Sequence, residues 1–156
     1  MLRTLATLFG FVVSVSLVAC STVAPNAVAT PDFHRTPLAA TPPLIGAWRY
    51  EYPGSGCIEQ YEFRVDGTRI SVSGDERLMT EFEIRDLADF VGFYRWKDRV
   101  VTSNGRRDCS GSIVPVGDVA TGYLHVDATA DSIALCSLPV IDACFATFRR
   151  VRPRSA

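Results

Sequence analysis

Hydrophobic and polar residues alternate with a period of two over much of the chain beyond residue 44. Trp48, Tyr50 and Tyr52 alternate with Arg49 and Glu51. This alternation is typical of a strand with one buried and one solvent-facing side. Recurrences of the pattern predict further strands at 61–65, 70–72, 82–84, 91–96, 123–126, 133–135 and 145–151.

Turn-forming residues separate these segments. Asp66-Gly67 predicts a tight hairpin, because the two residues tolerate positive φ angles, and Asn104-Gly105 predicts a second one. The sequence contains no amphipathic run of helix length. Eight to ten short strands in succession predict an all-β domain, a small antiparallel meander that either closes into a barrel or folds as a two-layer sandwich.

The first twenty residues have the features of an export signal. An apolar stretch at 5–18 follows the single positive charge of Arg3. It is shorter than the ~20 residues that span a bilayer but has the length of a secretory h-region. The stretch ends in Leu17-Val18-Ala19-Cys20, which resembles the lipobox of bacterial lipoproteins.

That resemblance implies removal of a signal peptide, residues 1–19, and acylation of Cys20 as the mature N-terminus. The acyl chains on Cys20 would then anchor the protein to a membrane. Ser21 follows, whereas aspartate at this position is the inner-membrane retention signal of enteric bacteria. We therefore expect the protein on the periplasmic face of the outer membrane.

The remaining chain divides into a tether, a domain and a short tail. Residues 20–43 carry five of the nine prolines, so we expect an extended segment that does not pack, with His34 a solvated residue within it. Residues 44–153 are enough for one core and form the expected β-domain, and 154–156 are a tail. The prolines are Pro25, Pro31, Pro37, Pro42 and Pro43.

The two ends of the domain resemble lipocalins and other calycin barrels. Gly46-Ala47-Trp48 opens the first strand, and Arg149-Arg150 closes the last. In that superfamily the Gly-x-Trp tryptophan lies at the closed end, and an arginine of the final strand packs over its indole ring, a cation–π contact. Strand alternation allows only one of Arg149 and Arg150 to face inward.

A second resemblance concerns the loop Pro53-Gly54-Ser55-Gly56. Small periplasmic lipoproteins that inhibit lysozyme are also calycin-like barrels with disulfides and a lipobox, and their inhibitory loops are rich in Ser and Gly. The same composition is typical of an ordinary flexible connection between strands. The loop therefore leaves both interpretations open.

The domain contains four cysteines, an even number, in an exported and oxidising setting, which predicts two disulfides. Four cysteines allow three pairings. The spacing favours Cys136 with Cys144 and Cys57 with Cys109, while Cys57 with Cys144 stays an alternative, because the last strand of a closed barrel starts beside the end of the first. The gaps of 52, 27 and 8 residues lack the C-x-x-C spacing of zinc and redox sites, so we expect no metal.

Charge and catalytic motifs narrow the function classes. The 16 basic and 17 acidic residues give no excess of positive charge for nucleic acid. The domain's one histidine, His125, alternates with Leu124 and Val126 and is expected on a solvent-facing side. We interpret the carboxylates Glu81, Glu83, Asp86 and Asp89 as a solvated polar face. Nucleophile elbows and phosphate-binding glycine loops are absent from the sequence, so we expect no enzyme and no cofactor.

These observations predict a lipid-anchored protein of the cell envelope with a non-catalytic binding domain. The domain would dock or inhibit another, unidentified envelope protein. The alternative is a lipocalin-like carrier of a small apolar ligand, because aromatic residues of the domain could line a cavity as well as fill it. Those residues are Phe82, Phe90, Phe93, Tyr94 and Trp96.

Overall fold

The computed structural model describes residues 33–35, 43–86, 90 and 92–152. The signal peptide, Cys20, most of the tether and the 154–156 tail lie outside the described residues. The elements follow in the order β1 (Gly46–Glu51), β2 (Ile58–Phe63), β3 (Thr68–Ser73), β4 (Glu76–Asp86), β5 (Phe93–Ser103), β6 (Val119–Val126), β7 (Ser132–Cys136), the 3₁₀ turn η1 (Ile141–Ala143) and β8 (Cys144–Arg150).

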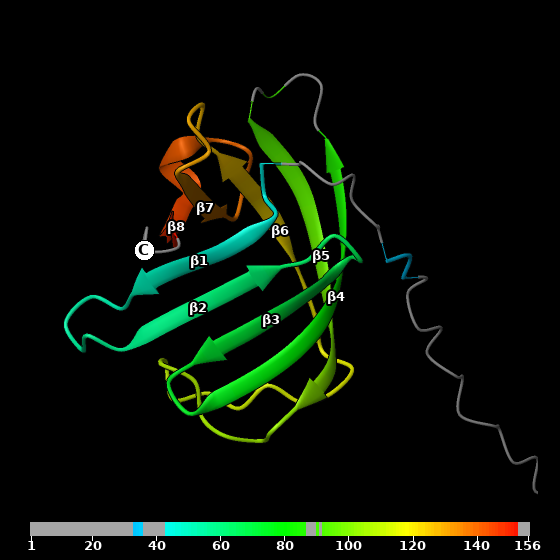
Figure 1. Ribbon diagram of the computed structural model, residues 1–156, viewed down its shortest axis with the longest axis vertical. Helices are drawn as coiled ribbons and strands as arrows, with labels where there is room; N and C mark the ends of the chain where they lie inside the picture. The colour runs from blue at the N-terminus through cyan, green and yellow to red at the C-terminus, as the bar shows by residue number, and fades with distance from the viewer. Residues whose placement is uncertain (1–32, 36–42, 87–89, 91, 153–156) are drawn as a thin grey trace, which may run out of the picture. The chain divides into compact units, whose positions relative to one another are not determined.

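The strands form one closed antiparallel barrel (Figure 1). Each strand pairs with the next along the chain, and β1 pairs with β8 to close the sheet. The prediction of an all-β meander is confirmed, and of its two forms the barrel is the one adopted. The eight described strands lie within the predicted range of eight to ten.

The two predicted hairpins differ from each other. At Asp66-Gly67 the chain does turn tightly between β2 and β3, and Gly67 takes the positive φ of 80°. Asn104-Gly105 instead begins a long connection, residues 104–118, so a tight hairpin at that position is wrong. The Asn104 side chain accepts a hydrogen bond from the Arg77 backbone N–H and donates one to the Asp75 carbonyl oxygen. Asn104 is therefore held beside the start of β4 and does not form a tight turn into β6.

Strand β3 lies where the alternation predicted it, but its apolar residues face outward. Arg69 is paired with Phe63 of β2 in the register, and paired residues share one face of a sheet. Because Phe63 is buried in the interior, Arg69 points inward too. Ile70 and Val72 therefore lie on the outer surface, where they are half-buried.

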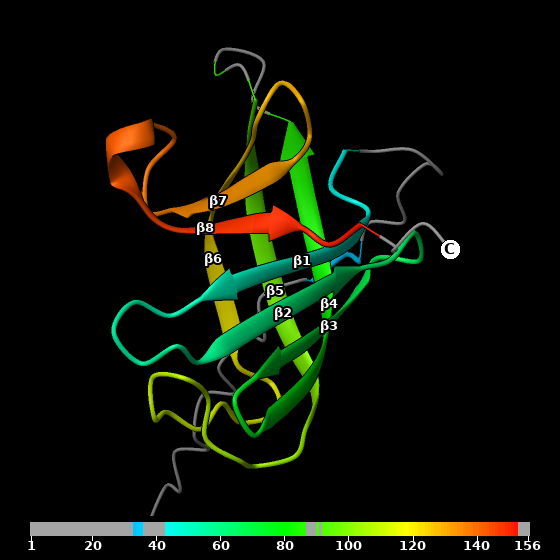
Figure 2. The ribbon, with the colours of Figure 1, turned by 60° about the vertical axis from the view of Figure 1, so that its left-hand side comes forward.

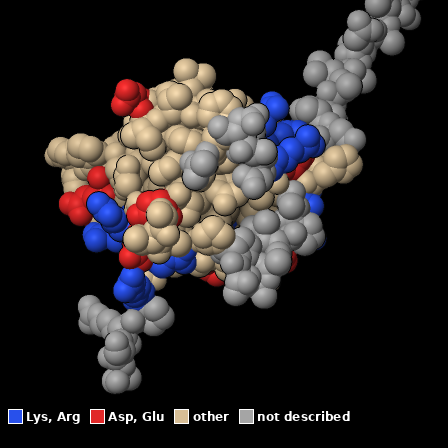
Figure 3. Space-filling view, turned by 90° about the horizontal axis from the view of Figure 1, so that it is seen from above, with Lys and Arg blue, Asp and Glu red and all other residues tan. Residues whose placement is uncertain are grey.

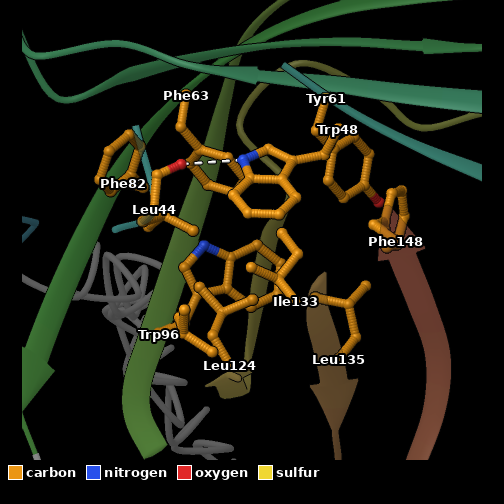
Figure 4. Close-up of a cluster of buried hydrophobic side chains, with 11 residues drawn as sticks. Leu44, Trp48, Tyr61, Phe63, Phe82, Trp96, Leu124, Ile133, Leu135 and Phe148 are labelled. Carbon is orange, nitrogen blue, oxygen red and sulfur yellow. Dashed lines mark hydrogen bonds between the residues drawn. The ribbon is translucent and has the colours of Figure 1, made fainter. Parts of the chain in front are cut away.

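One end of the barrel interior is filled by apolar side chains (Figure 4). Trp48 is fully buried there, and its indole N–H donates a 2.8 Å hydrogen bond to the carbonyl oxygen of Leu44. Aromatic rings pack edge to face and stacked around it, as in the Phe63–Phe82 and Tyr61–Phe148 pairs. The fully buried large side chains are Trp48, Phe63, Phe82, Phe148, Leu124 and Ile133.

Arg150 covers this closed end. Its guanidinium lies 4.1 Å from the centre of a Trp48 ring and donates to the carbonyl oxygens of Pro43, Ile45 and Ala130. Gly46 has a φ of +127°, a backbone conformation that favours glycine, and a Cβ there would lie 2.9 Å from Arg150 Nη1, so a larger residue would also displace the guanidinium. Arg149, one residue earlier in the strand, is exposed on the outer face.

Three residues of the segment expected to be an unpacked tether contact the outer face of β4 and β5. The Phe33 ring lies 5.2 Å from Lys97 Nζ and 4.7 Å from the Arg99 guanidinium carbon. The His34 backbone N–H donates to Glu83, and Arg35 lies within 4.0 Å of Glu81. The expectation that this segment does not pack is therefore wrong at 33–35, because an aromatic ring there lies against two cations.

We expect truncation of Trp48→Ala to lower the free energy of unfolding by about 3 to 5 kcal/mol, since it removes a fully buried indole and leaves a cavity. Chemical denaturation measures the loss. Arg49→Ala, which removes an exposed neighbour on the same strand, is the control and should change stability by less than about 0.5 kcal/mol. A loss below about 1 kcal/mol for Trp48→Ala would contradict the closing role of this residue.

Candidate functional site

The connections of an antiparallel meander alternate between the two ends of the barrel. The β1–β2, β3–β4, β5–β6 and β7–β8 connections therefore lie at the end opposite Trp48 and Arg150, which we call the mouth. Figure 2 shows the long 104–118 connection close to the β3–β4 turn. Hydrogen bonds between these segments, such as that from Cys109 N–H to the Ser73 hydroxyl at 3.1 Å, fix the connection to the rim.

A disulfide holds the rim of the mouth in place. Cys57 at the end of the β1–β2 loop is bonded to Cys109 in the 104–118 connection. The bridge closes a separation of 52 residues, which stabilises the fold by about 4 kcal/mol in the chain-entropy treatment. The second disulfide, Cys136–Cys144, joins β7 to β8 outside the interior core. These are the pairings that the spacing favoured.

Inside the mouth lies a cavity of about 220 Å³. Unlike the closed end, it is lined by charged and polar side chains as well as apolar ones, from β2, β3, β4, β5, β6 and the 104–118 connection. The aliphatic lining residues are Leu78, Val100, Val114 and Ala120. Five carboxyl groups face one guanidinium across it. The charged lining residues are Glu59, Arg69, Glu76, Asp98, Asp108 and Asp118, and the aromatic ones are Tyr61 and Trp96.

A buried ion pair forms the floor of the cavity. Arg69 Nη2 donates to Asp98 Oδ2, and the two side chains are only 6% and 4% exposed. The guanidinium carbon also lies 4.1 Å from the centre of the Tyr61 ring. Burial opposes the charge of Arg69, but Asp98, Tyr61 and Glu59 together outweigh burial and raise the pKa of Arg69. Arg69 therefore keeps its charge inside the barrel.

Several buried polar atoms around the ion pair have no hydrogen-bond partner among the described residues. They are donors as well as acceptors, and such groups carry a desolvation cost unless a water or ligand satisfies them. The donors are Arg69 Nε, Arg69 Nη1 and Trp96 Nε1, and the acceptors are Glu76 Oε1 and Asp98 Oδ1.

Desolvation shifts the titration of the cavity carboxyls. Burial, followed by the charge of Asp108, raises the pKa of Glu76. Burial also raises the pKa of Glu59, although this carboxylate accepts a 2.7 Å hydrogen bond from the Tyr61 hydroxyl. Burial therefore disfavours the charged form of both groups, and an added cation would favour it.

The sequence interpretation missed these residues. Strand β3 was read from its apolar residues, which face outward, so Arg69 was not recognised as an interior side chain. The position of Asp98 could have been inferred from the sequence, because it lies two residues from both Trp96 and Val100 and must share their buried face of the strand. A carboxylate in phase with two core residues requires a buried partner.

The residues that were considered for catalysis lie elsewhere. His125 is half-buried on the outer face with its ring 4.6 Å from that of Phe93. Glu81 pairs with Arg99 at 2.8 Å, and Glu83 with Lys97 at 3.7 Å, also on the outer face. Asp86 belongs to β4, and Asp89 lies outside the described residues.

The five aromatic residues that the sequence offered as a cavity lining do not line one common cavity. Phe82 is fully buried in the closed end, Trp96 contacts both that core and the mouth cavity, and Tyr94 packs against the core. Phe93 belongs to a small outer cluster beside the Cys136–Cys144 disulfide, and Phe90 is 43% exposed. The Pro53–Gly56 loop is exposed beside the disulfide at the rim of the mouth.

We expect Glu76→Gln to raise the unfolding temperature near neutral pH, with the gain shrinking at about pH 4. The pKa of Glu76 is raised above its ordinary 4.5, so the folded state binds this proton more tightly than the unfolded state. Ionisation of Glu76 therefore destabilises the fold as pH rises through this range. Thermal denaturation followed by circular dichroism measures the effect, and Glu62→Gln, on the outer face of β2, controls for net charge. An equal gain at both pH values would contradict the assignment.

Among the described residues, no helix has the length and apolar character to cross a membrane, and no three metal-ligating side chains gather in one place. Models of protein families, curated proteins and solved structures gave no match to this chain.

Proposed function

We propose that this protein is a non-catalytic binding module of the bacterial cell envelope that holds a small polar ligand in the mouth of its barrel. The observation that carries the proposal is the group of five unsatisfied polar atoms on Arg69, Glu76, Trp96 and Asp98 around one cavity. Buried donors and acceptors without partners, on residues that line a preformed space, are ordinary features of a ligand site.

An apolar ligand fits the interior less well. The closed end is occupied by its own rings, and Trp48, Phe63, Phe82 and Phe148 are all fully buried. The remaining space is at the mouth, where an apolar molecule would leave the Arg69–Asp98 pair and its unsatisfied atoms without partners. A polar occupant removes that cost.

The proposed cellular location is based on the lipobox-like Leu17-Val18-Ala19-Cys20. Acyl chains on Cys20 would hold the barrel at the periplasmic face of the outer membrane, with the proline-containing segment between them. Two disulfides in the barrel accord with an oxidising compartment.

Replacing Cys20→Ala should release the protein from the membrane fraction, because its apolar stretch is too short to anchor it alone. Fractionation followed by a carbonate wash measures the distribution, and Ser21→Ala is the matched control that should stay bound. A Cys20→Ala protein that remains in the washed membranes would overturn the lipid anchor.

Docking of another envelope protein is the second candidate. Four large apolar side chains are exposed on and beside the loop that the Cys136–Cys144 disulfide closes, with Phe145 68% exposed. This loop lies toward the top of Figure 1, and the view from above in Figure 3 shows few charged side chains away from the margins. Exposed apolar groups of this kind mark interaction surfaces. The four are Leu138, Val140, Ile141 and Phe145.

Native mass spectrometry of the lipidated protein purified from membranes tests the first proposal. We expect a small-molecule adduct that is lost in Ser71→Leu, because this substitution fills the mouth cavity without changing a charged group. Val72→Leu, one residue along β3 but on its outer face, should retain the adduct.

The absence of any adduct on the wild-type protein, or an equal adduct on Ser71→Leu, would overturn ligand binding at the mouth. Cross-linking in intact cells tests the docking candidate in the same strains. A cross-linked partner that is lost in Phe145→Ser but kept in Ser71→Leu would favour docking through the exposed loop.

A further inference from the structure

We infer that the mouth cavity is selective for a small organic cation, an ammonium group with an oxygen acceptor close to it. This inference rests on the proposed function, because it names the ligand class of the same cavity. An amino sugar and an amino-acid amide are examples of this chemistry. The charge, the unsatisfied atoms and the size of the cavity each support one part of it.

The charge of the lining favours a cation. Five carboxyl groups and one guanidinium face the space, and the guanidinium of Arg69 is already paired with Asp98. Glu59 approaches from β2 and Glu76 from β4, while Asp108 and Asp118 lie on the 104–118 connection. An anionic ligand would add to this repulsion, whereas a cation would relieve it.

The unsatisfied acceptors place the positive charge near the floor. Glu76 and Asp98 are each 3% exposed, and each has one carboxylate oxygen without a donor among the described residues. An ammonium group has three N–H donors and can serve both oxygens at once. Charge-assisted hydrogen bonds of this kind are about twice as strong as neutral ones.

The unsatisfied donors require an oxygen on the same ligand. Arg69 Nε, Arg69 Nη1 and Trp96 Nε1 are buried N–H donors of residues that line the cavity, and they have no acceptor among the described residues. A bare metal ion would satisfy the carboxylates and leave these three donors unpaired. A hydroxyl or carbonyl oxygen near the ammonium group can accept from them, so the pattern favours an organic ligand.

The volume limits the size of that ligand. A cavity of about 220 Å³ has room for about seven waters at ~30 Å³ each. It is smaller than the ~300–1,000 Å³ pockets that hold drug-sized molecules. A single sugar ring or a single amino-acid unit is therefore the expected scale.

Isothermal titration of the full lipidated protein in detergent tests the inference with two matched pairs of probes. Glucosamine and glycinamide carry the ammonium group, and N-acetylglucosamine and N-acetylglycinamide are their neutral counterparts. We expect at least one cation to bind at least tenfold more tightly than its acetylated partner. Glu76→Gln should weaken that binding at least tenfold, while Glu62→Gln on the outer face should leave it unchanged.

The Glu76→Gln variant stays interpretable, because removal of a desolvated carboxylate should not unfold the barrel, and denaturation checks this. Acetylated probes that bind as well as the cations, or no binding by either cation, would overturn the ligand class. Tighter binding of calcium chloride at the same site would overturn it in favour of a metal. In all these cases an adduct lost in Ser71→Leu would still support the proposed function.

Discussion

The barrel depends on the contact between Trp48 and Arg150, where the first strand meets the last. In the described strands β1 and β8 are paired through only two residue pairs, Trp48–Arg150 and Arg49–Arg149. Arg150 adds hydrogen bonds to three backbone carbonyls and covers the indole ring, so one side chain joins the segment just before β1, the β6–β7 turn and the core. Gly46 makes room for it. Without this closure the sheet would have two open edges.

Closure divides the interior into two regions of opposite character. The end beneath Arg150 is filled by aromatic and aliphatic side chains, while the mouth contains Arg69, Asp98 and Glu76. A buried ion pair is not a strong source of stability, since its desolvation offsets much of its attraction. Removal of one partner is nevertheless costly, because the other charge is left alone in the interior. Replacement of such a pair by apolar side chains of similar volume is often neutral or stabilising, so the Arg69–Asp98 pair is not what holds the barrel together.

The rim of the mouth is held by a disulfide and by hydrogen bonds between its loops. The Cys57–Cys109 disulfide and the hydrogen bonds of Asn104 and Cys109 hold the 104–118 connection against the β3–β4 turn. A preformed cavity binds a ligand without the cost of ordering its own loops. This geometry supports the proposed ligand site, while the other disulfide closes the exposed apolar loop around Ile141.

The sequence by itself determined the class of fold, the positions of most strands and the favoured cysteine pairing, because these depend on local alternation, turn residues and spacing. It also determined the candidate pair Trp48 with Arg149 or Arg150, although only the tertiary structure decided for Arg150. The candidate site was not predictable in the same way. Which face of β3 points inward depends on its register with β2, and register is a relation between strands that a period of two leaves undecided. For the same reason the meeting of Arg69 and Asp98, 29 residues apart, was decided only when the barrel closed.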